Sequence, residues 1–547
     1  MYSSGSKSKT QSQGSNTTLF YAIFAAGVGI RLFHLIYNRS LWMDEVYLST
    51  SLVKMSANEL VSNSLYYQQK APIGFLLATK LFVNVFGNKE IFLRIFPLIS
   101  GLLSMLIFIP VSRFFLKNQA ALLAFTIFCL SPALVYHSVE IKQYSTELLG
   151  TVLSLFLFIK FKEEKYINSL LFWGIAGGTI LWFSYASIFV LGGIGIGSSV
   201  YNLSKKNWKV FFISLIPFSI WLISFVVNYL LFTHQHAESQ WIVYWFRAYD
   251  NFMPFPPKSI GDLKWFAMNF YRMLDYPLGL LWNFGAVTKY QGLNMILKMP
   301  VLPILLLVIG FYATIKKKNA ETFLILLIPI ALTFLASGLE LYPLTERFWV
   351  FISPIFLIIL GIGFEYFSFK LKSKLLSNLI FSLLIIGPVF GSIDSFTNTK
   401  NFYIHKKSFQ REALSYLNKN YSKDDAVYIY WNNLPGFRLY NEMYKYNFKA
   451  IEGTDHRNNS KNYEEYYQNL RNDFNEIFKY KRVWVVYNTQ FLTDIGDRID
   501  TPEWYYTKDL SPSDHLLNEL LKTYTPLKKY VTKDIAVYLL ELKPKKR

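Results

Sequence analysis

The chain has 547 residues, of which 52% are hydrophobic, 18% aromatic and 17% charged. This composition excludes an ordinary soluble protein and favours a polytopic membrane protein with long apolar helices. The single cysteine, Cys129, excludes an intrachain disulfide framework and a cysteine-ligated metal site. The net charge of +20 suggests nucleic-acid binding at first, but Lys and Arg gather in short loops between apolar runs, as in cytoplasmic loops of membrane proteins.

The N-terminal segment 1–17 is rich in Ser, basic, and poor in large apolar residues, so we expect a disordered cytoplasmic tail. The apolar run 18–37 follows, and no small-residue cleavage site comes after it. It is therefore predicted to be an uncleaved signal anchor and the first membrane span.

Ten further apolar runs have roughly the length of a membrane span. They are 91–113, 119–137, 144–161, 167–185, 186–203, 210–232, 298–315, 320–338, 347–369 and 375–394. The run 72–88 is ambiguous, because it is short and contains Lys80 and Asn84. If it spanned, every later basic loop would lie opposite the N-terminal tail, so the positive-inside rule predicts eleven spans, with 45–90 as amphipathic helices on the membrane.

This topology predicts a polytopic α-helical membrane module, 18–394, followed by a soluble extracytoplasmic α/β domain, 395–547. The outer loops are then 38–90, 138–143, 233–297 and 339–346. In the C-terminal domain, the periodicity predicts a helix over 408–420 and strands over 426–431, 481–487 and 535–542.

Several charged and polar residues lie at the predicted outer ends of the spans. They are Asp44, Glu45, Lys70, Arg94, Glu140, Lys142, Tyr144 and Arg347. A carboxylate there can accept a proton from an attacking hydroxyl, and Lys or Arg can bind a phosphate and stabilise its charge as it leaves. The pattern favours a site for an anionic lipid headgroup, with outer-loop aromatics such as Tyr67 available to stack on a sugar.

Each residue also has a simpler structural explanation. Asp44 and Glu45 suit the start of an amphipathic helix, where acids are favoured. Lys70 and the arginines could anchor the chain at lipid headgroups, and Glu140 could pair with a neighbouring cation. In the loop 233–297, the sequence THQHAES offers metal ligands in His234, His236 and Glu238, although loop histidines more often bind no metal.

The ordered set of motifs resembles the GT-C membrane glycosyltransferases, and most closely the bacterial branch related to protein O-mannosyltransferases and lipid A aminoarabinose transferases. The matching segments are LWMDEVY, which contains Asp44 and Glu45, then QKAPIGFLLATKLFVNVFG, EIFLRIFPLISG, the Ser131–Pro132 and Glu140–Tyr144 region, and Arg347 with Pro354. The resemblance covers roughly 18–370. Gln69 stands where the aminoarabinose branch has an acid, and the His-Pro-Pro variant is absent.

The resemblance implies an inverting glycosyltransferase with a polyprenyl-phosphate sugar donor. Asp44 is the expected catalytic base, assisted by Glu45, and the donor phosphate is expected to lie near Lys70, Arg94 and Arg347. The expected substrate-binding residues are Glu140, Lys142, Tyr144 and Tyr67. No cofactor is required by the pattern; if a divalent cation takes part, Glu140 is its first expected ligand.

The expected partners are the lipid-linked donor, a lipid, glycan or protein acceptor, and membrane lipids, but no nucleic acid. The expected location is a bacterial inner membrane with the N-terminus cytoplasmic. Two alternatives stay open: a membrane transporter, which usually places polar residues near the bilayer midplane in repeated halves, and a polymerase or ligase of lipid-linked glycans.

Overall fold

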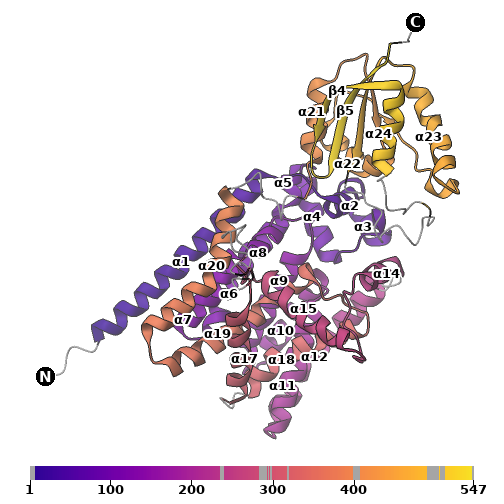
Figure 1. The fold of residues 1–547 in the computed structure, drawn as a ribbon. Coiled ribbons are helices and arrows are strands. Elements are labelled where there is room, and N and C mark those ends of the chain that lie inside the picture. Colours follow the sequence, from indigo (N-terminus) through magenta and orange to yellow (C-terminus); the bar gives the residue numbers. More distant parts are fainter. Residues whose placement is uncertain are drawn as a thin grey trace.

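The computed structural model describes residues 6–233, 240–282, 298–316, 320–397, 407–489 and 512–544, with Gly292, Met295 and Trp504. A bundle of apolar helices forms the larger part, and a smaller domain with a β-sheet lies at one end of it (Figure 1). The expected fold class, a polytopic helical membrane protein with a C-terminal α/β domain, is confirmed by this architecture.

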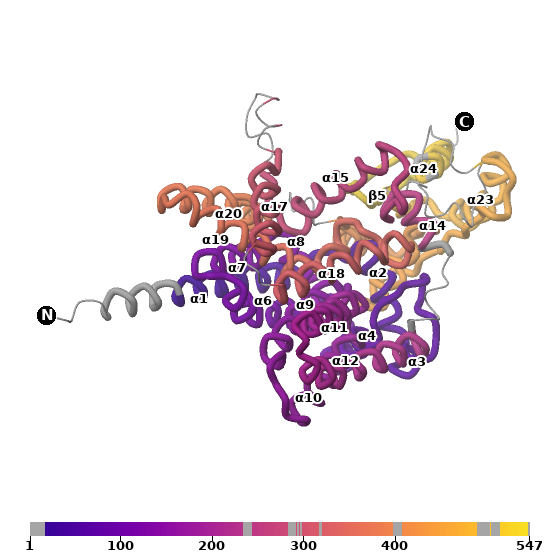
Figure 2. Tube along the Cα trace, turned by 90° about the horizontal axis from the view of Figure 1, so that it is seen from below, coloured from indigo at the N-terminus to yellow at the C-terminus, as the bar shows by residue number. Residues whose placement is uncertain are grey.

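Within the described residues, eight helices are long and apolar enough to cross a membrane. They lie within or across α1 (Ser6–Tyr37), α6 (Ile95–Phe115), α9 (Tyr144–Phe161), α11 (Ser187–Ser204), α12 (Trp208–Asn228), α18 (Ala320–Gly338), α19 (Ser353–Leu371) and α20 (Lys374–Thr397). Three shorter apolar helices, α7 (Asn118–Leu130), α10 (Ile167–Phe183) and α17 (Val301–Lys316), fall on three more predicted spans. Each of the eleven predicted spans therefore has a helix. Viewed from below, α1 and α20 lie at one side of the bundle and the largely buried α9 lies near its middle (Figure 2).

Two span boundaries differ from the sequence prediction. The run 119–137 divides into α7 and the short helix α8 (Pro132–His137), because Ser131 is extended and Pro132 starts a new helix. At the N-terminus, α1 already begins at Ser6, so the helical backbone reaches into the segment predicted to be disordered. Residues 1–5 of that predicted tail lie outside the described residues.

The segment predicted to be the first outer loop is largely helical, as expected for amphipathic helices. It contains α2 (Met43–Lys54), α3 (Ala57–Ser62), the short 3-10 helix η1 (Tyr66–Gln68), α4 (Ile73–Phe86) and α5 (Glu90–Leu93). The ambiguous run 72–88 is α4, and its Lys80 donates to the carbonyl of Leu52 in α2 at 3.0 Å. Lys80 is thus used to tie α4 to its neighbour within this loop. Two further helices, α14 (Gln240–Ala248) and α15 (Ile260–Asp275), belong to the loop 233–297.

The C-terminal domain contains a five-stranded mixed sheet in the order β2-β1-β3-β5-β4. β1 (Ala426–Ile429) pairs in parallel with β2 (Ile451–Glu452) and β3 (Arg482–Asn488), whereas β5 (Ile535–Leu542) runs antiparallel to β3 and β4 (Tyr524–Val531). The helices are α21 (Gln410–Asn420), α22 (Leu434–Tyr444), α23 (Tyr463–Ile477) and α24 (Pro512–Thr523). The predicted helix and three strands are all present. β4 escaped prediction because it is an exposed edge strand with Pro526 and two lysines, which read as turn residues.

The first outer loop and the C-terminal domain share one apolar core. The buried side chains of Leu41, Leu48 and Phe75 belong to the same cluster as Leu414 and the strands of the sheet. The membrane helices form a separate cluster, in which α19 is buried on nearly all sides. The C-terminal domain is therefore packed onto the loop that carries Asp44, rather than tethered beside it.

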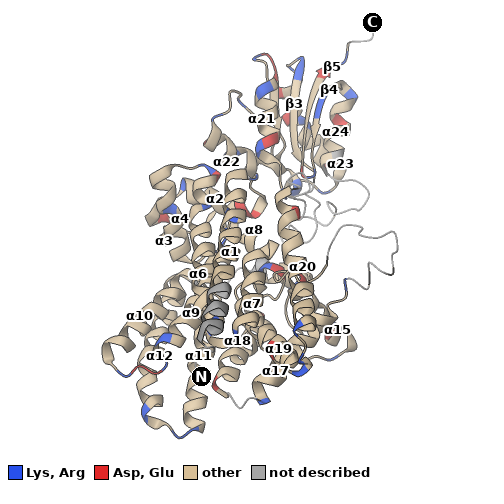
Figure 3. Cartoon of the chain, turned by 90° about the vertical axis from the view of Figure 1, so that its left-hand side faces the viewer, with Lys and Arg blue, Asp and Glu red and all other residues tan. Residues whose placement is uncertain are grey.

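The charged residues divide the molecule into two ends. Lys and Arg gather in loops at the end of the bundle that lies away from the sheet domain (Figure 3). These are the loops at 113–117, 160–165, 205–209 and 370–374. The helices α2 to α5 lie at the opposite end, next to α21 and α22 (Figure 1). This separation is the arrangement that the positive-inside argument requires.

Candidate active site

Asp44 and Glu45 lie in the first turn of α2, where the helix dipole favours negative charge. Trp42 precedes the helix in an extended conformation, and its backbone N–H donates to the Glu45 carboxylate at 3.4 Å. Glu45 thus folds back toward the start of the helix. Because successive residues of a helix point in different directions, the two neighbouring carboxylates enter different surroundings.

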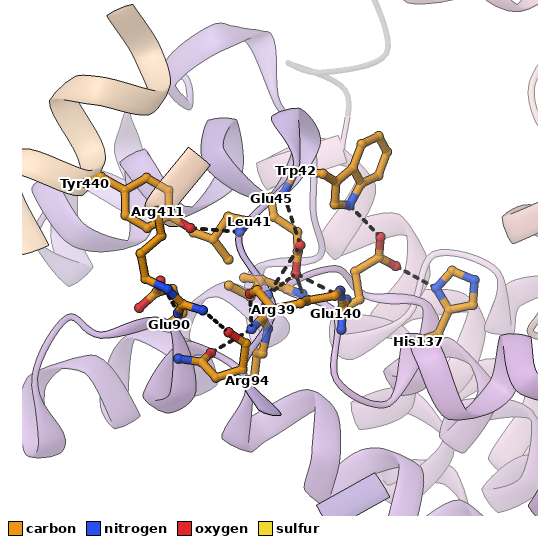
Figure 4. A network of polar contacts seen from close by, with 12 residues as sticks. Arg39, Leu41, Trp42, Glu45, Glu90, Arg94, His137, Glu140, Arg411 and Tyr440 are labelled. Carbon is orange, nitrogen blue, oxygen red and sulfur yellow. Dashed lines mark hydrogen bonds and ion pairs between the residues drawn. The ribbon is translucent and has the colours of Figure 1, made fainter. Parts of the chain in front are cut away.

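Glu45 lies in a buried ionic network with Arg39 and Arg94, here called the Glu45 network (Figure 4). Its Oε1 atom is 3.3 Å from Arg94 Nη2 and 3.7 Å from Arg39 Nη2, and it accepts the backbone N–H of Ile141 at 3.0 Å. Arg94 also donates to Asn38 and to the Arg39 carbonyl, each at 2.8 Å.

Neither Glu45 nor Arg94 exposes any side-chain surface. Glu45 is predicted to assist catalysis and Arg94 to bind the donor phosphate, and in this structure both side chains lie inside the network. Glu45 joins the 38–45 segment to Ile141 of the 138–143 loop, and Arg94 joins that segment to the start of α6.

Asp44 faces the outside of this network. Its side chain is 27% exposed, and its Oδ2 atom accepts from Arg347 Nη1 at 2.8 Å; Arg347 is 23% exposed. Burial raises the pKa of Asp44, but Arg347 and Lys142 outweigh burial and hold the pKa below its ordinary value. Asp44 is consequently an ionised, water-accessible carboxylate at neutral pH. Asp44, Lys142 and Arg347 are called the Asp44 cluster below.

Glu140 is buried, and both of its carboxylate oxygens are in hydrogen-bond contact with neighbouring side chains. Its Oε1 accepts from Trp42 Nε1 at 2.9 Å, and its Oε2 is 2.6 Å from His137 Nδ1 (Figure 4). The other ring nitrogen of His137 is 2.5 Å from the Tyr276 hydroxyl. Burial would raise the pKa of Glu140, but His137 and the surrounding cations keep it well below the ordinary value. Glu140 therefore stays charged and positions Trp42 and His137.

Glu140 is the residue expected to ligate a divalent cation, if one takes part. Each carboxylate oxygen of Glu140 is in one hydrogen-bond contact, with Trp42 or with His137, and keeps a further lone pair. Among the residues that the structure describes, no three His, Cys, Asp or Glu side chains are grouped as a metal site would need. The predicted ligands His234, His236 and Glu238 lie outside the described residues.

Lys142 joins the 138–143 loop to the middle of the first outer loop. Its Nζ donates to Gln69 Oε1 at 2.6 Å, and Asp44 and Arg347 both act on its charge. Lys70 follows Gln69 directly and is half-buried, and burial lowers its pKa. Lys70 makes no hydrogen bond or ion pair with any residue in the described ranges. The departure of Gln69 from an acid thus leaves Lys70 without the neighbouring negative charge that an acid would supply.

The two predicted tyrosines lie in different places. Tyr144 is buried, with the Arg347 guanidinium 5.9 Å from its ring centre and the His137 ring 4.9 Å away. Tyr67 is exposed and stacks on Tyr47 at 4.4 Å. Tyr144 therefore supports the Asp44 cluster from inside, whereas Tyr67 belongs to the surface of the first outer loop.

Sequence reasoning missed Arg39, Trp42, His137, Tyr276 and Lys407. One signal was available: His137 precedes Glu140 by three residues in HSVE, a spacing that suits contact across one helical turn. Tyr276 and Lys407 carried no signal, because they reach the site only through tertiary packing.

Comparisons with known proteins agree with this architecture. Residues 70–232 match the family model described as dolichyl-phosphate-mannose-protein mannosyltransferase. The crystal structure of ArnT from Cupriavidus metallidurans bound to undecaprenyl phosphate has a TM-score of 0.53 at 12% identity, covering 95% of this chain and 97% of that chain. The apo structure of the same protein has a TM-score of 0.51 at 12% identity, covering 96% and 98%. A search of curated proteins finds no match.

The family match covers Lys70, Arg94 and the 138–143 loop, and the shared fold extends over almost the whole chain. The shared fold confirms the expected fold class, a polytopic helical membrane protein of the GT-C type with a C-terminal α/β domain, and residues 70–232 are similar to the mannosyltransferase family named above.

Proposed function

We propose that the protein transfers a sugar from a polyprenyl-phosphate donor to an acceptor at the extracytoplasmic face, with inversion at the anomeric carbon. The observation that carries this proposal is the ionised, partly exposed Asp44, paired with Arg347 at the outer end of a GT-C bundle. The donor class is supported by the family description, which names a dolichyl-phosphate sugar, and by the undecaprenyl phosphate bound to ArnT.

In the proposed reaction, the acceptor hydroxyl attacks the anomeric carbon while the bond from that carbon to the phosphate oxygen breaks. The electron pair of the breaking bond leaves with the lipid phosphate. Asp44 accepts the hydroxyl hydrogen bond and takes the proton late, because the hydroxyl becomes acidic only as its oxygen bonds to carbon. A carboxylate with a low pKa is adequate for this late transfer, and it is fully ionised beforehand.

The lipid phosphate needs compensation for the negative charge that it gains on leaving. Arg347 uses one Nη for Asp44, and its other guanidinium N–H groups have no partner among the described residues. Lys70 and Lys142 supply further positive charge in the adjoining loops. Preorganised cations at a leaving phosphate lower the barrier because they bind the transition state more tightly than the ground state.

The decisive experiment uses purified protein in detergent with radiolabelled undecaprenyl-phosphate hexose and pentose donors, following loss of label from the lipid. Asp44→Asn should lower transfer or slow hydrolysis by roughly 10²- to 10⁴-fold, the usual contribution of a general base. The matched control is Asp424→Asn, which changes an exposed carboxylate of the C-terminal domain and should keep the wild-type rate.

Normal turnover by Asp44→Asn would remove Asp44 as the base. Failure of the wild type to consume any donor in a broad panel would overturn the proposed reaction and favour transport or polymerisation.

We also propose that the N-terminus is cytoplasmic and the C-terminal domain extracytoplasmic, in a bacterial inner membrane. The only cysteine, Cys129, is buried, so single cysteines can be introduced and labelled selectively. A membrane-impermeant maleimide should label Lys529→Cys in intact spheroplasts and Lys205→Cys only after permeabilisation. The reverse labelling pattern would invert the proposed orientation.

A further inference from the structure

Lys407 lies beside the Asp44 cluster although it is more than 360 residues away from Trp42 in sequence. It precedes α21, the first helix of the C-terminal domain. Its Nζ is 3.9 Å from the centre of the Trp42 ring and 5.6 Å from that of Tyr136. The guanidinium of Arg347 is 5.6 Å from the same Trp42 ring. Two cations from distant parts of the chain thus meet at one indole.

Within the described residues, the ammonium group of Lys407 is not paired with an anion. It makes no ion pair or hydrogen bond with any residue in the described part of the chain. Three carboxylates act on its charge, those of Glu140, Asp44 and Glu346. Asp44 pairs with Arg347, and Glu140 is in hydrogen-bond contact with Trp42 and His137. Burial lowers the pKa of Lys407, although Glu140 and Asp44 act in the opposite direction. Contact with aromatic rings offsets only part of the cost of burying a cation.

Two anchors that follow Lys407 in the chain hold its backbone, one in the C-terminal domain and one in the membrane module. The backbone N–H of Phe409 donates to the Asp534 carboxylate at 3.1 and 3.3 Å, which ties the segment to the turn before β5. The backbone N–H of Arg411 donates to Ser40 Oγ at 3.1 Å, and the Arg411 guanidinium is 2.9 Å from Glu90. Lys407 lies two residues before Phe409 and four before Arg411. The docking of the C-terminal domain therefore fixes its position.

The charges around Trp42 favour an anion as the missing partner. Lys407, Arg347 and Lys142 supply three cations, and Lys70 adds a fourth in the neighbouring loop. They stand against the three carboxylates of Asp44, Glu140 and Glu346. A sugar-linked polyprenyl phosphate is a phosphodiester with one negative charge, whereas the released polyprenyl phosphate approaches two. A cation at this place therefore gains most as the bond to the sugar breaks.

We propose that Lys407 is a further phosphate-binding residue of this site, supplied by the C-terminal domain, which with Arg347 binds the phosphate of the polyprenyl-linked donor and of the released carrier. This inference rests on the proposed function. It also gives the C-terminal domain a direct part in the reaction, because that domain carries the cation into the membrane module's site.

The test measures binding of undecaprenyl phosphate and of neutral undecaprenol to the full-length protein in detergent. Lys407→Gln should weaken undecaprenyl phosphate binding by roughly 10- to 100-fold, the loss expected for one charged hydrogen bond, and leave undecaprenol binding unchanged. Lys407→Arg should retain most of the affinity. Lys529→Gln, which changes an exposed lysine on β4, is the matched control and should bind like the wild type.

The outcomes separate the two proposals. Wild-type binding of undecaprenyl phosphate with equal binding by Lys407→Gln would overturn the role of Lys407 and leave the proposed function standing. If Lys407→Gln lost binding of undecaprenyl phosphate and of undecaprenol equally, the role of Lys407 would also be overturned. A structural defect of the variant would then explain both losses. No binding of undecaprenyl phosphate by the wild type, together with no donor consumption, would overturn the proposed function and this inference with it. Inorganic phosphate, added as a competitor, distinguishes recognition of a free anion from recognition of the lipid-borne one.

Discussion

Asp44 and Glu45 are adjacent residues of one chemical type, yet the Asp44 cluster and the Glu45 network differ in almost every physical respect. Asp44 is 27% exposed and faces one arginine, whereas Glu45 is fully buried between two arginines and a backbone amide. A buried ion pair is costly to break from one side, because the remaining charge stays desolvated. Two adjacent acids at the start of one helix can therefore differ in environment, with Asp44 open to water and Glu45 holding the loop from inside.

The largest expected change in the free energy of unfolding follows substitution of Glu45, and substitution of Asp44 should change it little. Glu45→Ala leaves Arg39 and Arg94 buried without their counter-charge and should lower the free energy of unfolding by about 3–5 kcal/mol. Asp44→Asn should leave the melting temperature in detergent nearly unchanged. Thermal unfolding of both variants measures the difference, and Glu45→Gln, which keeps the acceptor oxygen for Ile141, should lie between them. An unchanged melting temperature in Glu45→Ala would contradict the structural role.

A smaller loss is expected at the joint between the two domains. Arg411 pairs with Glu90, which also accepts from Tyr444 at 2.6 Å, and the Tyr440 hydroxyl accepts from the Leu41 backbone at 2.8 Å. Arg411→Ala should destabilise this docking by about 1.5–3 kcal/mol, as for other hydrogen bonds to charged groups, and reduce activity through the altered position of Lys407.

The matched control for this joint is Arg438→Ala, which removes an exposed pair with Glu452 and should cost about 0–1 kcal/mol. Limited proteolysis between the domains and the melting temperature report on docking. If Arg411→Ala and Arg438→Ala had the same melting temperature and the same rate of proteolysis, the Arg411–Glu90 pair would not stabilise the docking of the two domains.

The pH dependence of activity tests the Asp44 cluster alone. Burial raises the pKa of Asp44, and Arg347 is the strongest group opposing it, so the folded pKa is below the ordinary value of 3.8. The ionised form is therefore present above that value and is lost only as pH falls through the lower folded pKa. Removing the arginine in Arg347→Gln should move the acid limb of the residual donor consumption to higher pH.

The control for this shift is Arg247→Gln, which breaks an exposed pair with Glu340 and should leave the pH profile unchanged. An acid limb in Arg347→Gln at the wild-type position would show that another group governs the profile.

The smallest expected effect concerns Tyr67, on the exposed side of the first outer loop. Tyr67→Ala removes a partly exposed ring that stacks on Tyr47 and that is predicted to meet a sugar. It should weaken substrate affinity by about 0.5–1.5 kcal/mol, seen as a raised KM with kcat preserved. Tyr166→Ala, an exposed aromatic at the basic end of the bundle, should have no effect on KM. A matching rise in both variants would remove Tyr67 from the site.

Most of the fold was predictable from local pattern. Each apolar run produced its helix, because a run of spanning length has no other way to satisfy its backbone in lipid. The strands β1, β3 and β5 were found because they are short apolar runs rich in β-branched and aromatic residues. The edge strand β4, with its proline and lysines, was not.

Many residues of the candidate site could be predicted from the sequence, but the hydrogen bonds and ion pairs between them could not. The sequence shows that Asp44, Glu45, Glu140, Lys142 and Arg347 come together at one face, because topology brings the span ends there. It does not show which carboxylate is buried, since Asp44 and Glu45 differ only by 100° around α2 and by the length of one methylene.

The amino-acid sequence by itself therefore determined the positions of the apolar helices and the class of fold, which follow from hydrophobicity along the chain. Only the tertiary structure decided that Glu45 and Arg94 form a fully buried ion pair, that His137 and Trp42 both contact Glu140, and that Lys407 of the C-terminal domain lies on the Trp42 ring. The physical reason is that burial and pairing depend on neighbours separated by tens to hundreds of residues, and no local pattern records them.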